Sequence, residues 1–191
     1  LGSLFTSKYP FKTGITYFHF DHDIPNIFDI LKDEKYELHS FVPDLSFFKK
    51  MTEKFDKNEY YVYDKRGDWL QLVGFGDEIL EKFNHMNNPW FYFIHLMDLR
   101  PPYFLPPEFD KNEFGETKYD RMLSYVDQWV GKFLEKIDLD NTIFVLSADH
   151  GDYISVLDED LNEINAKEII DSFINDNPLK PGSYRGRKNS A

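Results

Sequence analysis

The sequence has 191 residues, with 22 lysines and arginines against 34 aspartates and glutamates, a formal net charge of −12. This acid excess argues against a general nucleic-acid binder, because such proteins need a basic face. Hydrophobic residues make up 41% of the chain and cysteine is absent, which predicts one domain with a filled core and excludes a disulfide framework or a cysteine nucleophile within these residues. No apolar run reaches the roughly 18 residues that span a bilayer.

Helices and strands are predicted to alternate through the first 85 residues. The helices are expected where apolar residues recur at helical spacing, and the strands where short apolar runs end at turn residues. The predicted ranges are 24–35 (helix), 37–42 (strand), 45–55 (helix), 60–63 (strand) and 69–85 (helix). Pro25 suits the first turn of the first helix, whereas Gly74 and Gly76 count against the last helix because glycine is a poor helix former.

Two later apolar runs are predicted to be strands buried on both faces. They are residues 90–96 and the β-branched run 142–147. Between them, residues 118–137 form the clearest predicted helix, since its apolar residues lie on one stripe. This order predicts right-handed parallel βαβ units, and therefore an α/β fold with a mostly parallel sheet sandwiched by helices.

The domain is predicted to extend over residues 1–157. Residues 158–191 are predicted to be an acidic helix up to residue 177, followed by a polar, locally basic and flexible tail. The acidic stretch is most simply a solvated face.

Polar side chains follow the second of the two buried strands. Asp149 and His150 stand there, before Gly151. Ligands of open α/β sheets bind outside the carboxyl ends of the strands, and a carboxylate oxygen with an imidazole nitrogen is a plausible half-site for a divalent cation. The alternative is a turn in which Asp149 caps the next element and His150 lies on the surface.

The first buried strand also ends in polar side chains, His95, Asp98 and Arg100. Arg100 could pair with an anionic group such as sulfate or phosphate. The alternative is that His95 is a core histidine and that Asp98 and Arg100 form a local ion pair. Residues 17–23 alternate histidine and aspartate, which resembles metal-ligand spacing but is more often a solvated connection.

Three segments, in this order, resemble the sulfatase branch of the alkaline-phosphatase-like superfamily. SLFTSKYP at residues 3–10 resembles the stretch that follows the sulfatase nucleophile motif. FIHLMDLRPPY at residues 93–103 resembles a strand end with a substrate-contacting histidine. The helix from residue 119 and the run DNTIFVLSADHG at residues 140–151 resemble the helix and the Ser-Asp-His-Gly strand end of the family.

This resemblance implies an alkaline-phosphatase-like fold with a divalent metal at the strand ends. A nucleophile, formylglycine in sulfatases or Ser/Thr in phosphate-transferring relatives, attacks sulfur or phosphorus, and the metal and basic groups neutralise charge. Asp149 and His150 fall on the metal-ligand pair, and His95 on the substrate-contacting histidine. Calcium is the expected ion, with manganese, magnesium or zinc as alternatives. The expected substrate is a small-molecule or glycan sulfate or phosphate ester.

The sequence also departs from the sulfatase pattern. Arg100 stands where the family has a second histidine, and an arginine keeps the positive charge but cannot donate a proton near neutral pH. The nucleophile motif and the N-terminal aspartate ligands are expected upstream of Leu1. We therefore predict a sulfatase-like, metal-dependent hydrolase of sulfate esters whose nucleophile lies outside this chain. The alternatives are a phosphoester hydrolase or phospho-transferase of the same fold, or a non-catalytic remnant that acts as a binding module.

Overall fold

The centre of the molecule is a three-stranded parallel sheet. The structure, a computed structural model, describes residues 1–16, 19–62, 72–101, 103–151, 156–157 and 163–164. The sheet consists of β1 (Glu37–Pro43), β2 (Lys57–Tyr61) and β3 (Trp90–Ile94) in the order β2–β1–β3. His39 of β1 is paired with Lys57 on one side and with Tyr92 on the other. The predicted α/β class with a parallel sheet is confirmed.

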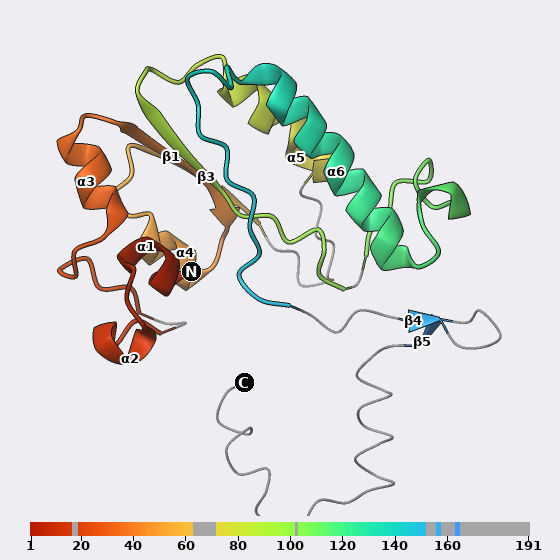
Figure 1. Cartoon of the computed structure of the whole chain (residues 1–191), viewed down its shortest axis with the longest axis horizontal. Helices are drawn as coiled ribbons and strands as arrows, with labels where there is room; N and C mark the ends of the chain where they lie inside the picture. Colours follow the sequence, from red (N-terminus) through yellow and green to blue (C-terminus); the bar gives the residue numbers. More distant parts are fainter. Residues whose placement is uncertain (17–18, 63–71, 102, 152–155, 158–162, 165–191) are drawn as a thin grey trace, which may run out of the picture.

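Helices cover both faces of this sheet, as Figure 1 shows. One face carries α1 (Gly2–Thr6), α3 (Ile27–Asp33) and α4 (Ser46–Met51), and the other carries α5 (Leu72–Lys82) and α6 (Lys118–Lys136). The short helices α2 (Pro10–Thr13) and η1 (Asn112–Phe114) lie in the connections. Because side chains alternate along a strand, β1 supplies both cores: Leu38 and Val42 join the first, and Phe41 joins the second.

The helix boundaries follow from capping residues. The side chain of Asn26 caps α3 in a reciprocal capping box with Asp29, so the helix begins after Pro25 and not at residue 24 as predicted. Thr117 and Asp120 form the same motif at the start of α6. The predicted helix 118–137 is therefore confirmed to within one residue.

Gly76 lies on the buried side of α5, where the helix packs closely against α6. A Cβ atom at this position would lie 2.4 Å from the indole ring of Trp129 on α6, so glycine is what allows the two helices to pack at this point. Trp129 is itself buried in the second core. Gly131 on α6 differs, because nothing lies within 4 Å of a Cβ atom there.

The predicted strand 142–147 is wrong. These residues have no strand assignment, and Ile143 is 92% exposed. β3 is half-buried along its length, not buried on both faces as predicted. A β-branched, apolar composition favours an extended backbone, but ladder hydrogen bonds and burial need a neighbouring strand. No strand among the described residues pairs with 142–147.

The C-terminal part is described only at two short strands, β4 (Val156–Leu157) and β5 (Glu163–Ile164), which pair antiparallel. The acidic helix predicted over 158–177 is therefore wrong at Glu163–Ile164, and its other residues lie outside the described part. The tail up to residue 191 lies outside it too, so the boundary at residue 157 stays a prediction. Among the described helices, none has the length and apolar character to cross a bilayer.

Candidate functional site

His95 directly follows β3 and is held in place through its backbone. Its N–H donates to the carbonyl of Phe41 at 2.9 Å, and its carbonyl accepts from the Tyr61 hydroxyl at 2.8 Å. Its ring lies against Phe48 of α4, with 4.6 Å between the ring centroids. Burial lowers the pKa of His95, while the negative charge of Asp149 acts in the opposite direction. The side chain is therefore a neutral imidazole over most of the neutral range.

Asp149 and His150 lie near His95 although they do not follow a strand. Asp149 is close enough for its charge to raise the pKa of His95, and His150 lowers it. His150 Nε2 lies 3.7 Å from Asp149 Oδ2, and its Nδ1 lies 2.8 Å from the carbonyl oxygen of Gly151. Both residues are exposed. The structure thus brings three of the four predicted site residues into one neighbourhood.

The first residue of the chain lies in the same neighbourhood. The amino group of Leu1 lowers the pKa of His95, as a nearby positive charge does. Leu1 enters α1, which packs through Phe5 against Phe93 of β3, with 5.1 Å between the ring centroids. The chain start, the end of β3 and residues 149–150 therefore meet at one end of the sheet.

Arg100 ends the turn that follows β3. Its backbone N–H donates to the carbonyl of Met97 at 2.9 Å, and its side chain is exposed. It lies five residues after His95, on the same turn. Its predicted contact with an anionic substrate stays a prediction.

Comparison with known proteins decides the family. A family model described as Sulfatase matches residues 1–187, nearly the whole chain. The chain belongs to the sulfatase family. No curated protein matches it. Among solved structures, the C-terminal periplasmic domain of EcEptC from Escherichia coli matches with 16% identity and a TM-score of 0.43. That match covers 59% of this chain, and the chain spans 37% of the length of that domain.

Membership in the sulfatase family confirms the resemblance found in the sequence. Sulfatases generally use a divalent metal, and the donor atoms of Asp149 and His150 suit two ligands of such an ion. Among the described residues, no group of three or more histidine, aspartate or glutamate side chains gathers to hold a metal. The donor atoms of the two residues fit a half-site for such an ion.

Asp98, expected from the sequence as a polar residue after the strand or as a local ion-pair partner of Arg100, is a buried group. It is 4% exposed, and its Oδ1 accepts from the backbone N–H of Leu72 at 3.2 Å. Among the residues that the structure describes, no hydrogen-bond partner reaches its buried Oδ2. Burial raises the pKa of Asp98 to about 7. The sequence pattern gave no sign of this, because Asp98 stands between apolar residues in a short turn that reads equally as exposed.

The His/Asp alternation in residues 17–23 serves local structure where it is described. His22 Nε2 lies 2.6 Å from the carbonyl oxygen of Lys50 and 3.4 Å from Glu53 Oε1. Asp21 accepts from the backbone N–H of Asp23. The His22 side chain, 9% exposed, is thus used in contacts with Lys50 and Glu53, and no group of three metal-binding side chains gathers here in the described part of the chain.

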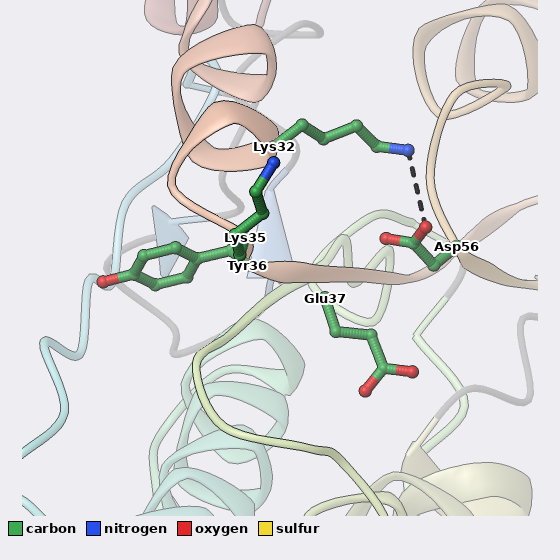
Figure 2. Close-up of a pocket in the computed structure, with 5 residues that line it drawn as sticks. All are labelled: Lys32, Lys35, Tyr36, Glu37 and Asp56. Atoms are coloured by element: carbon green, nitrogen blue, oxygen red, sulfur yellow. Dashed lines mark hydrogen bonds and ion pairs between the residues drawn. The ribbon is translucent and has the colours of Figure 1, made fainter.

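A surface hollow of about 370 Å³ lies at the opposite end of the sheet, beside the start of β1. Figure 2 shows its lining residues, with the Lys32 ammonium directed at the carboxylate of Asp56. Asp56 also accepts from the backbone N–H of Leu38 at 2.8 Å. The polar groups of this hollow are thus engaged in holding the amino end of the sheet, away from His95.

Proposed function

We propose that this chain belongs to a metal-dependent hydrolase of sulfate esters and supplies His95, Arg100, Asp149 and His150 to its active site. The substrate class is a small-molecule or glycan sulfate ester. The nucleophile that forms the covalent intermediate in sulfatases is proposed to lie upstream of Leu1. The observation that carries this proposal is that Asp149 lies close enough to His95 for its charge to act on the pKa of His95, in a chain of the sulfatase family.

Each residue has a chemical role in this proposal. His95, neutral because burial lowers its pKa, donates a ring N–H to an ester oxygen. Arg100 pairs its planar guanidinium with the non-bridging oxygens of the sulfate group. Asp149 and His150 would hold a divalent cation, calcium in the first place, with manganese, magnesium or zinc as alternatives; such an ion neutralises charge on the oxygens of the transferred group.

The test is the turnover of an aryl sulfate and an aryl phosphate by the 191-residue chain and by its longer parent, with added calcium, manganese or zinc. We expect little or no turnover by the chain, because the proposal assigns it two metal ligands and places the activated nucleophile upstream of Leu1. We expect the parent to be active and Asp149→Ala to lower its kcat at least about a hundredfold. Glu135→Ala, at an exposed position of α6, is the control and should leave kcat unchanged.

The same experiment separates the alternatives. Faster turnover of the phosphate than of the sulfate by the parent supports the phosphoester hydrolase or phospho-transferase. An inactive parent that still binds sulfate supports the non-catalytic binding module. Robust turnover by the 191-residue chain, or an active parent indifferent to Asp149→Ala, contradicts the proposal.

A further inference from the structure

The turn that follows β3 has little support from the sheet itself. β3 ends at Ile94, and after it His95 adds one ladder bond to Phe41. Within the turn, the Arg100 N–H donates to the Met97 carbonyl. A turn that lies outside the ladder of a sheet opens easily unless other elements hold it.

Two buried side chains hold this turn from opposite sides. Tyr61, at the end of β2, is 4% exposed, stacks on Phe41 and donates to the carbonyl of His95. Asp98, within the turn, is equally buried and accepts from the N–H of Leu72, the first residue of α5. The two contacts connect the turn to the sheet on one side and to the α5–α6 layer on the other.

The burial of Asp98 requires an explanation. Burying a carboxylate without a partner for each oxygen costs free energy. A residue of this kind in a native fold therefore calls for a specific role. The contact that it makes is at the amino terminus of an eleven-residue helix, where the helix dipole favours a negative group. The charge of Asp98 also acts on Tyr61 and Tyr125, so both of these side chains lie near it.

We propose that Asp98 is a positioning residue: by accepting from the Leu72 N–H it fixes the turn that carries His95 and Arg100, with Tyr61 as the second tether of the same turn. The kinetic part of this inference rests on the proposed function, because it is that function which gives His95 and Arg100 their roles. The structural part, the ordering of the turn, does not.

The opposite end of the sheet offers a matched control. Asp56 also accepts from a backbone N–H with its carboxylate, that of Leu38 at the start of β1. Replacement of either aspartate by leucine removes the same kind of hydrogen bond at a similar volume. If Asp98 contributed only to the overall stability of the fold, the two variants would show the same pattern of amide exchange rates. If Asp98 positions the turn, Asp98→Leu should change the exchange rates of the turn alone.

The experiment measures amide hydrogen exchange by NMR in the 191-residue chain. In Asp98→Leu, we expect exchange of the Arg100 amide to accelerate about two- to tenfold, the range that the loss of one hydrogen bond implies. The Glu37 amide, which donates to Pro89 at the other end of the sheet, should keep its rate. Asp56→Leu should give the reverse pattern, and Asp98→Asn, which keeps the acceptor oxygen, should restore a wild-type rate at Arg100.

Turnover by an active parent gives the second readout. Asp98→Leu should lower kcat about a hundredfold, the cost of a misplaced catalytic group, with a smaller change in KM, and Asp98→Asn should restore it. If the parent has no turnover, the proposed function fails while the exchange rates still decide this inference.

The inference is overturned if Asp98→Leu leaves the Arg100 exchange rate unchanged, or if Asp56→Leu accelerates it equally. If Asp98→Leu does not fold, Tyr61→Phe is used in its place, because it removes the hydroxyl that donates to the His95 carbonyl in the same turn. Faster exchange at Arg100 in Tyr61→Phe supports the inference, and an unchanged rate overturns it.

Discussion

Strand β3 and the segment 142–147 are two apolar runs of similar composition with different fates in the same molecule. β3 is hydrogen-bonded to β1 along its whole length and its side chains are half-buried. Residues 142–147 have no strand partner among the described residues, and their largest side chains are exposed. Each run is nonetheless followed by residues of the candidate site, His95 and Arg100 after β3 and Asp149 and His150 after residue 147.

The difference shows what composition alone decides. Apolar and β-branched residues favour an extended backbone, but pairing and burial are properties of the neighbours. β3 lies beside β1, whose side chains serve two cores. The carboxylates that follow the two runs differ in the same way, since Asp98 is buried and Asp149 is exposed.

The pH dependence of stability should distinguish these two carboxylates most strongly. The pKa of Asp98 is raised from 3.8 to about 7, so between about pH 4 and pH 7 the folded chain keeps a proton that the unfolded chain has lost. The contribution of Asp98 to stability therefore falls as the pH rises through this window. The full loss is on the order of 4 kcal/mol, since one pKa unit corresponds to about 1.36 kcal/mol.

Urea unfolding of Asp98→Asn at pH 5 and pH 8 measures this effect. The variant should exceed the wild type in stability by a small margin at pH 5, where part of the loss has already occurred, and by a larger margin at pH 8, where the wild-type carboxylate is charged and buried. Asp149→Asn, the exposed counterpart, should change the free energy of unfolding by less than about 0.5 kcal/mol at both pH values. Equal stability of Asp98→Asn and the wild type at pH 8 would mean that Asp98 is not buried as described.

Alanine variants of one leucine in β1 and one in residues 142–147 compare the strand-paired region with the unpaired one directly. Leu38 of β1 is 0% exposed and Leu146 is 71% exposed. Leu38→Ala should lower the free energy of unfolding by about 2–5 kcal/mol, the usual cost of a cavity in a core, and Leu146→Ala by less than about 0.5 kcal/mol. A large loss in Leu146→Ala would show that residues 142–147 are buried in solution, and the comparison would then fail.

Two helix glycines test the packing of the layer that covers β3. Gly76→Ala should destabilise the chain by about 1–3 kcal/mol, because the new methyl group would overlap the ring of Trp129. Gly131→Ala should stabilise it by about 0.5–1 kcal/mol, because that helix position has open space and alanine has the better helix propensity. Thermal unfolding measures both changes, and effects of the same sign would contradict the described contact of α5 and α6.

Sequence periodicity was sufficient to predict an element whose structure depends mainly on its own residues. The apolar stripe on α6 predicted that helix closely, and the structure adds the capping box of Thr117 and Asp120 at its start. The parallel α/β class followed from the order of the elements. Periodicity was insufficient where a neighbour decides, as for residues 142–147, where it predicted burial that the described residues do not provide.

The candidate site divides in the same way. His95, Asp149 and His150 could be found because a family motif marks them, and Arg100 because it breaks that motif. The hydrogen bonds of Asp98 to Leu72 and of Tyr61 to His95 could not be predicted, because they join residues 26 and 34 positions apart in the sequence. Contacts of that kind depend on how the elements pack, which no local pattern encodes.

The central claim is that the end of β3 and residues 149–150 form one site, and an NMR titration of the His95 ring tests it most directly. In the metal-free chain, we expect the pKa of His95 to lie below its usual value, because burial lowers it. Asp149→Asn should lower it further, because the nearby negative charge that favours the imidazolium is then lost. An unchanged pKa of His95 in Asp149→Asn would contradict the claim, because it would mean that the two side chains do not meet.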